Sequence, residues 1–454
     1  MLEGAAGDVA LNGPIAWHSG NALGLVAAGD IAVNGDLAAT GQNAAIAMSA
    51  GGEIALAGKT AISGVNGALS MQAPGGHVLG EGAAITLSGA GASFSAHGQR
   101  YAVIQNLAQL QDIDRNLSGL YVLGNNLSGR GSIQAIGGPY GIFSGTFDGL
   151  GNTLGGYSVS GAGPNVGLFA ASSGSISNVN LASMTVNAPA TGAASMSVGA
   201  LVGRNSGQIV NVSTAGMSVK GSSYHRNVVG GLVGTNAGGS IDRATVAGSV
   251  YAGSHTIAIG GLAGENLNSA ASRGVITRSV SRNVVSGAMQ RDELGGMGGL
   301  VGVNRGLVAD ASSHANTQAT GAGLNVGGLV GSNLGGDIER SVATGRVQNG
   351  SSAYTGGLVG VNSGTISGSA AEGGVSAEGG GSTGGFAGRN SGGGLLLDVK
   401  AGGDVTAAYG VNVGAWSAPT MDASIRRRRV ARSRPATTGM EAGPAVWPAT
   451  TAAR

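Results

Sequence analysis

The stretch Gly357–Ile366, which reads GLVGVNSGTI, carries a motif that recurs seven times along this chain. Each copy has a glycine, apolar residues, a second glycine, one variable residue and an asparagine. Such regular recurrence indicates stacked units, because each unit can bury its apolar face only against its neighbours. The seven copies are Gly199–Asn205, Gly231–Asn236, Gly261–Asn266, Gly299–Asn304, Gly328–Asn333, Gly357–Asn362 and Gly385–Asn390.

The spacing of the copies and the pattern between them predict the fold class. An eighth, decayed copy stands at Gly167–Ala170, and successive copies lie 28 to 38 residues apart. Between copies, aliphatic residues alternate with small or polar ones and glycine interrupts them often, which is typical of short strands. We expect an all-β, right-handed parallel β-helix (β-solenoid) with three strands per repeat, each paired with its equivalent one coil away, at about 4.8 Å.

The repeated glycines and asparagines have a structural interpretation in such a stack. Turns between the faces of a solenoid often require positive φ, which glycine adopts freely and asparagine tolerates. Equivalent asparagines one coil apart can also pass amide hydrogen bonds along the stack. We therefore predict a structural asparagine ladder, with a ligand-binding row as the less favoured alternative. Its members are Asn205, Asn236, Asn266, Asn304, Asn333, Asn362 and Asn390.

Composition separates this chain from disordered glycine-rich proteins. It has 91 glycines in 454 residues, but 42% of the residues are hydrophobic, 10% are charged and only nine are proline. This balance argues against a low-complexity linker. The bias toward glycine, alanine and valine suits narrow coils with small inward side chains. Because only 4% of the residues are aromatic, a compact globular core is not expected.

Four zones follow one another along the chain. Residues 1–98 repeat at roughly 20 residues and predict a short-period β-helix shaft. Residues 99–165 break that pattern and form a connector, in which Leu107, Leu110 and Ile113 predict a short helix with Asn106 as its N-cap. Residues 166–420 contain the motif copies. Residues 421–454 form a basic tail.

The tail differs in charge from the rest of the chain. From Ser424 onward it has seven arginines and one glutamate, whereas residues 1–423 have 17 basic and 21 acidic residues. The net charges of +6 and −4 sum to the overall +2. Arginine runs are typical of nucleic-acid-binding segments, but the abrupt change favours a disordered or frameshifted end. We therefore predict no nucleic-acid partner.

Export signals and sites for chemistry are scarce in the sequence. The chain has no cysteine, which excludes disulfides, thiol catalysis and cysteine-based zinc sites. Its first residues do not form a signal peptide, and no apolar run is long enough to span a bilayer.

The six histidines lack metal-ligand spacing and are interpreted as surface residues. The acidic pairs Asp112 with Asp114 and Asp292 with Glu293 are interpreted as solvated loops. We predict no catalytic residue, metal or cofactor.

At the level of motifs, the pattern in Gly357–Ile366 resembles the GLUG motif of bacterial surface and secreted proteins. The N-terminal coils, for example Gly24–Gly41, resemble the shaft of filamentous haemagglutinin-type exoproteins of two-partner secretion systems. This resemblance implies a fibrous adhesin, exported through an outer-membrane transporter and located at the bacterial surface or outside the cell. Its implied partners are host cell-surface glycans or proteins. GLUG repeats also accompany secreted peptidases, and this chain has no peptidase motif.

Two classes of function remain open from the sequence. The first is a non-enzymatic fragment of an adhesin that binds through loops, notably Ala270–Gly295 and Tyr251–Ile257, and through the variable residue before each asparagine. The second is a carbohydrate-active β-helix enzyme, or the repeat region of a larger peptidase. Converging carboxylates in a groove would favour the enzyme. The variable residues are Arg204, Thr235, Glu265, Val303, Ser332, Val361 and Arg389.

Overall fold

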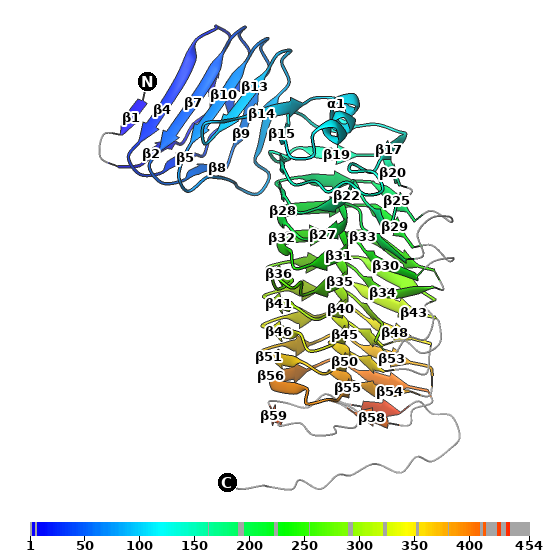
Figure 1. Ribbon diagram of the computed structural model, residues 1–454. Helices are drawn as coiled ribbons and strands as arrows, with labels where there is room; N and C mark the ends of the chain where they lie inside the picture. Colours follow the sequence, from blue (N-terminus) through cyan, green and yellow to red (C-terminus); the bar gives the residue numbers. More distant parts are fainter. Residues whose placement is uncertain are drawn as a thin grey trace.

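The chain is an almost all-β parallel β-solenoid, as its sequence predicts (Figure 1). Equivalent strands of successive coils pair in parallel and build long sheets along the stack. The computed structural model describes residues 2–4, 7–161, 163–188, 195–221, 226–253, 255–288, 294–320, 325–350, 354–379, 381–408, 412–414, 425–427 and 433–435.

The N-terminal stack has three strands in each coil. One coil consists of β4 (Ala22–Ala27), β5 (Ile31–Val33) and β6 (Leu37–Ala39), and the next coil begins with β7 (Ala45–Ala50). Leu25 is the register partner of Met48, and Met48 is the partner of Met71, so one coil advances by 23 residues. The sequence indicated roughly 20. These side chains fill a core of their own, which extends from Leu11 to Ala96 and also takes in Val122 and Leu150.

A reversal of the chain separates this stack from the next. Strands β13 (Ser93–Ala96) and β14 (Gln99–Ile104) pair antiparallel, and His97 and Gly98 between them have φ of 49° and 71°. The short helix α1 (Leu107–Gln111) follows, and the Asn106 side chain accepts a hydrogen bond from the Gln109 amide. The predicted helix and its N-cap are thus confirmed. Figure 1 shows the two stacks at an angle, with α1 beside the bend.

Two sheets of the second stack contain the motif and the strand before it. The motif sheet consists of β22 (Phe169–Ser172), β27 (Val202–Asn205), β31 (Val233–Ala237), β35 (Ala263–Leu267), β40 (Val301–Asn304), β45 (Val330–Asn333), β50 (Val359–Asn362) and β55 (Ala387–Asn390). The facing sheet consists of β21 (Asn165–Val166), β26 (Ser195–Val198), β30 (Arg226–Gly230), β34 (Thr256–Gly260), β39 (Gly296–Gly298), β44 (Val326–Gly327), β49 (Thr355–Gly356), β54 (Ser382–Gly384) and β58 (Asn412–Gly414).

Two further sheets close each coil. The long sheet includes β23 (Ser175–Ser177), β24 (Asn180–Ala182), β28 (Gln208–Ala215), β32 (Ser240–Val246), β36 (Val275–Thr277), β37 (Val280–Ser281), β41 (Leu307–Ala309), β42 (Ser312–Ser313), β46 (Asp337–Glu339), β47 (Val342–Ala343) and β56 (Leu395–Ala401). The edge sheet includes β25 (Thr185–Asn187), β29 (Met217–Lys220), β33 (Gly248–Ala252), β38 (Val284–Gly287), β43 (Asn316–Ala319), β48 (Val347–Asn349), β53 (Val375–Ala377) and β57 (Val405–Ala407).

The expectation of three strands per repeat is therefore wrong for the second stack. The coil that starts at Val301 contains five short strands, β40 to β44. Asp310, with φ of 52°, lies between β41 and β42, where a left-handed backbone bends the chain and divides the long-sheet strand in two. Residues at the same position of other coils, such as Asn178, Asn211 and Arg278, also have positive φ.

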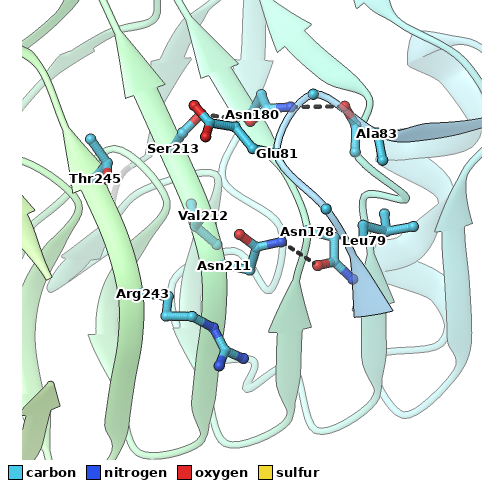
Figure 2. Close-up of a pocket in the computed structure, with 13 residues that line it drawn as sticks. Leu79, Glu81, Ala83, Asn178, Asn180, Asn211, Val212, Ser213, Arg243 and Thr245 are labelled. Atoms are coloured by element: carbon cyan, nitrogen blue, oxygen red, sulfur yellow. Dashed lines mark hydrogen bonds between the residues drawn. The ribbon is translucent and has the colours of Figure 1, made fainter. Parts of the chain in front are cut away.

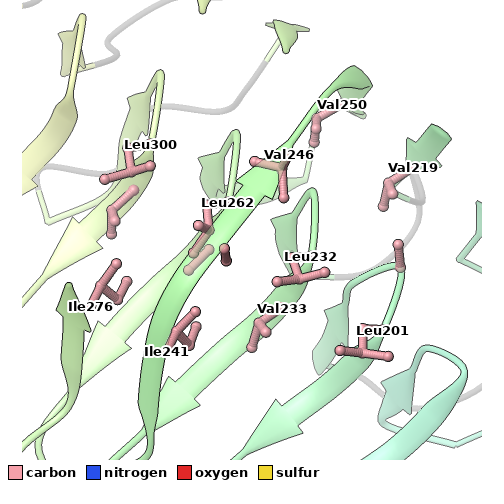
Figure 3. Close-up of a cluster of buried hydrophobic side chains, with 14 of the residues drawn as sticks. Leu201, Val219, Leu232, Val233, Ile241, Val246, Val250, Leu262, Ile276 and Leu300 are labelled. Carbon is pink, nitrogen blue, oxygen red and sulfur yellow. The ribbon is translucent and has the colours of Figure 1, made fainter. Parts of the chain in front are cut away.

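The apolar residue of each motif faces a continuous core. Figure 3 shows Leu201, Leu232, Leu262 and Leu300 following one another along the stack, with Ile241 opposite them. All five side chains are fully buried and belong to one cluster that runs from Ile104 to Val405. Each coil thus buries its leucine against its neighbours, which is the contact that a repeat cannot make alone.

The predicted binding loops are shorter than the sequence indicated. Within Ala270–Gly295, the strands β36 and β37 continue the long sheet and β38 continues the edge sheet, which leaves the connections 268–274 and 288–295. Within Tyr251–Ile257, β33 and β34 leave only residues 253–255. Their alternating small and apolar residues pair with strands on either side, so they are part of the scaffold. Asp292 and Glu293 lie outside the described residues.

The predicted basic tail lies mostly outside the described residues. Two short strands belong to it, β59 (Ile425–Arg427) and β60 (Ser433–Pro435). β59 pairs with β56, and β60 pairs with β57, both in parallel. These two segments therefore extend the long sheet and the edge sheet.

Candidate functional site

The seven motif asparagines form one hydrogen-bonded ladder inside the stack. The Nδ2 group of each donates to Oδ1 of the next, as in the pair Asn304 to Asn333 at 2.8 Å. The other five links measure 2.7 or 2.8 Å. The amides also contact the backbone of their own coil, since Asn333 Nδ2 donates to Gly336 O at 2.9 Å and Asn304 Oδ1 accepts from the Gly306 amide.

Burial gives the ladder a structural role. All seven side chains have no exposed surface, so a ligand outside the stack has no access to them. A buried amide is stabilising only when its donors and acceptors are paired, and here each coil supplies the partners of the next. The ladder therefore fixes the register between coils.

The motif glycines have a steric role that differs from the one we predicted. All of them lie within the described ranges, and none is among the residues with positive φ. They let the motif sheet approach the backbone of the facing sheet, and we call this close contact the seam. A Cβ on Gly302 would lie 2.6 Å from Ile259 N and from Gly264 O. The facing sheet also requires glycine at the seam, because a Cβ on Gly298, at the end of β39, would lie 1.9 Å from Val301 O.

The variable residues before the asparagines form one row on the motif sheet, and most of them lie in the seam. Val303 packs with Val228 and Ala258 of the facing sheet, and Ser332 Oγ accepts a hydrogen bond from Asn325 Nδ2. Thr235, Val303, Ser332 and Val361 are each less than 9% exposed. The hypothesis that the whole row contacts partners is thus wrong, because the facing sheet covers its middle.

Only the ends of this row reach the surface. Arg204 is exposed, and together with Thr235 and Glu265 it lines a shallow groove of about 410 Å³. At the other end the Arg389 guanidinium lies 5.1 Å from the centre of the Tyr354 ring. The exposed part of the row is therefore confined to a few coils.

A partly buried ion pair joins the two stacks. His77 of β11 (His77–Leu79) lies 2.9 Å from the Asp148 carboxylate of β18 (Thr146–Asp148), measured from Nε2 to Oδ2. Asp148 Oδ1 also accepts hydrogen bonds from the Leu150 amide and from Asn178 Nδ2. Burial disfavours the charged imidazole, but the hydrogen bond and the charge of Asp148 outweigh it and raise the pKa of His77 above its ordinary 6.5.

This pair predicts that the contact between the stacks weakens at high pH. Because the pKa of folded His77 is raised, its stabilisation is fully present below 6.5 and is lost as the pH rises through the folded value. Hydrogen-exchange protection factors, which correct for the intrinsic rise of exchange with pH, should therefore be lower in residues 77–85 and 147–152 at pH 8.5 than at pH 6. His77→Gln should remove most of that difference, while exchange in the distant β50 strand serves as the control. Equal pH dependence in both proteins would contradict this assignment.

A polar groove lies beside the same contact. One wall is the turn Leu79–Ala83 of the N-terminal stack, and the other is the outer face of the long sheet. The groove has a volume of about 690 Å³. Figure 2 shows Glu81 at its rim, with the amide and hydroxyl side chains on the strands behind it and Arg243 toward one end. The long-sheet residues that line it are Asn178, Asn180, Asn211, Val212, Ser213, Arg243 and Thr245.

Sequence reasoning missed both features of this junction. The sequence predicts a surface position for His77, whereas the side chain is paired with Asp148, which is 71 residues away. The acidic pair singled out in the connector remains at the surface, where Asp112 contacts Arg115 at 3.4 Å. Asp114 Oδ1 accepts a hydrogen bond from the Gly137 amide at 2.6 Å. No periodic pattern connects His77 with Asp148, so the sequence offered no signal for the pair.

The described part of the chain has neither a cluster of metal ligands nor a helix that could span a membrane. No group of three or more histidine, aspartate or glutamate side chains is placed there to hold a metal ion. In the same residues, no helix has the length and apolar character needed to cross a bilayer.

Comparison with known proteins identifies the repeat. Residues 322–348 match the family model described as the GLUG motif. The matched stretch contains β44, β45, β46 and β47, and its motif copy shares the seam and the asparagine ladder with the other six. The chain is therefore a β-solenoid repeat protein that contains a GLUG motif at residues 322–348, and six other coils of its second stack carry a similar sequence. No curated protein matches the chain.

Proposed function

We propose that this chain is a fragment of a fibrous adhesin of the bacterial surface, or of a secreted one, and that it binds host glycans or proteins without catalysing a reaction. The observation that carries the proposal is the uninterrupted second stack. One apolar core and one asparagine ladder hold its coils in register, which provides a stiff elongated support. The resemblance to filamentous haemagglutinin-type proteins supports the same role, with export through an outer-membrane transporter.

The places where the coils differ also support this proposal. Connections between the edge sheet and the facing sheet range from three residues (253–255) to eight (288–295). Because the strands on both sides are stacked in register, the strand ends that these connections join are aligned along the stack. Variable segments displayed at regular intervals on a rigid scaffold are suited to binding partners.

The carboxylates in the two grooves also favour binding over glycoside cleavage. The junction groove has Glu81 as its carboxylate, and the shallow groove has Glu265. Hydrolysis of a glycosidic bond commonly uses two carboxylates that flank the bond. Each groove instead has one acidic residue and one arginine in its lining, Glu81 and Arg243 in the junction groove and Glu265 and Arg204 in the shallow groove.

Binding of the purified full chain to host cells tests the proposed function. We expect saturable binding to epithelial cells, to extracellular-matrix proteins or to a glycan array. Shortening the connection 288–295 to three residues should weaken that binding, because it removes most of a variable segment. The coil should still close, because the connection 253–255 joins the same two sheets with three residues. Unchanged circular dichroism of the variant is the control. Absence of binding to all three targets would refute the adhesin proposal.

A further inference from the structure

The junction groove presents polar side chains at the same positions of three successive coils. In one row Asn180 is the register partner of Ser213, and Ser213 is the partner of Thr245. A second row contains Asn178, Asn211 and Arg243, which share the left-handed backbone conformation. Successive members of each row are one coil apart, at about 4.8 Å. Beyond the groove, the partner of Thr245 is the apolar Val280.

Side-chain hydrogen bonds hold the first two coils of these rows in place. Asn211 Nδ2 donates to Asn178 Oδ1 at 2.7 Å, and Ser213 Oγ donates to Asn180 Oδ1 at 2.5 Å. Asn180 Nδ2 in turn donates to Gly151 O on the groove wall at 2.8 Å. The polar surface is thus ordered before a ligand arrives, which lowers the entropic cost of binding.

Other polar groups of the groove remain available. The Glu81 carboxylate and the Thr245 hydroxyl have no hydrogen-bond or ion-pair partner within the described ranges, and both residues are exposed. Arg243 has only a loose contact of 3.6 Å with Asp242. Amide and hydroxyl side chains both donate and accept hydrogen bonds. They therefore complement a ligand whose groups can donate and accept hydrogen bonds as well.

The charges of the groove disfavour a ligand that carries many charges of one sign. Glu81 and Arg243 contribute one negative and one positive charge, so a uniformly charged polymer would meet a like charge at one of them. No aromatic side chain lines the groove. An uncharged polymer whose units carry hydroxyl groups fits these conditions better than a nucleic acid or a peptide with large apolar side chains.

We infer that the junction groove binds a neutral, unbranched oligosaccharide of about three sugar units, which lies along the stack axis across the three coils. The inference deepens the proposed function and rests on it for the source of the glycan, and it adds the groove as a recognition site besides the variable connections. Glu81 and Thr245 supply the free acceptor and hydroxyl, and the preformed asparagine pairs supply the remaining contacts.

Calorimetric titration of the full chain with cellotriose, maltotriose and triacetylchitotriose tests this inference. We expect at least one of these neutral trisaccharides to bind, and a sulfated heparin tetrasaccharide to bind at least tenfold more weakly. Thr245→Val removes a hydroxyl at constant shape and should weaken binding about three- to tenfold. Glu81→Gln should reduce the discrimination against the sulfated probe, because it removes the negative charge.

Ser312→Ala is the matched control, because Ser312 follows Val280 in the same row and lies outside the groove. Its trisaccharide affinity should equal that of the wild type. Trisaccharide binding without binding to host cells would support the groove and overturn the adhesin proposal. Host-cell binding combined with no trisaccharide binding, or with affinities unchanged by Thr245→Val and Glu81→Gln, would overturn the groove alone.

Discussion

Replacing Gly302 with alanine is expected to destabilise the stack by about 2–3 kcal/mol, since overpacking a closed contact costs that much. The new Cβ would lie 2.6 Å from Gly264 O and from Ile259 N. Both atoms belong to backbone that is paired with neighbouring coils, so neither can move without disturbing a sheet. Thermal unfolding followed by circular dichroism measures the loss, and hydrogen exchange should rise most in β35, β40 and β45.

Gly374→Ala provides the control for this substitution. Gly374 lies in the same stack, outside the left-handed region, and a Cβ there would have no atom closer than 3.7 Å. Its melting temperature should change little or rise slightly, because alanine lowers the entropy of the unfolded chain. If both variants were equally stable, the explanation that the seam requires glycine at position 302 for steric reasons would be wrong.

Replacing Asn304 with aspartate is expected to be the most damaging change in the ladder, at about 3–5 kcal/mol near neutral pH. Asn304 Nδ2 donates to Asn333, and its Oδ1 accepts from Asn266. Aspartate loses the donor and places a charge where the native side chain has no exposed surface. Denaturant unfolding of both proteins measures the difference.

Acid should partly restore the Asn304→Asp variant. Burial raises the pKa of a carboxyl group, so the destabilisation is present above that pKa and decreases as the pH falls and the neutral acid regains a donor. Asn187→Asp is the control, because Asn187 is exposed at the end of β25. A variant with the same stability deficit at pH 4 and pH 7.5 would show that the charge is not the cause.

The sequence was sufficient to predict the contacts between equivalent residues of neighbouring coils. The spacing of the motif leucines predicted stacked coils, and the recurring asparagines predicted a ladder, because each repeat meets its copies at the same position. The short helix after Asn106 also followed from local residues, through its cap and its apolar spacing.

Other features could not be predicted because they depend on how strands fold against each other within a coil. The glycines in GLVG suggested turns with positive φ, whereas Gly302 is required by backbone atoms of a facing strand. The same contact buries Val303 and Ser332, which sequence variation had suggested as contact residues. Similarly, the long apparent loop Ala270–Gly295 contains three strands that only their register partners identify.

By itself, then, the GLVGxN repeat determined that this protein is a β-solenoid with a leucine core and an asparagine ladder. The reason is that, in a stack of like units, equivalent residues of successive repeats are in contact, so the period of the sequence identifies those contacts. The tertiary structure alone decided the role of the motif glycines, the pairing of His77 with Asp148 and the groove beside that pair. These depend on the angle at which sheets and stacks meet, which brings together residues that no repeat relates to one another.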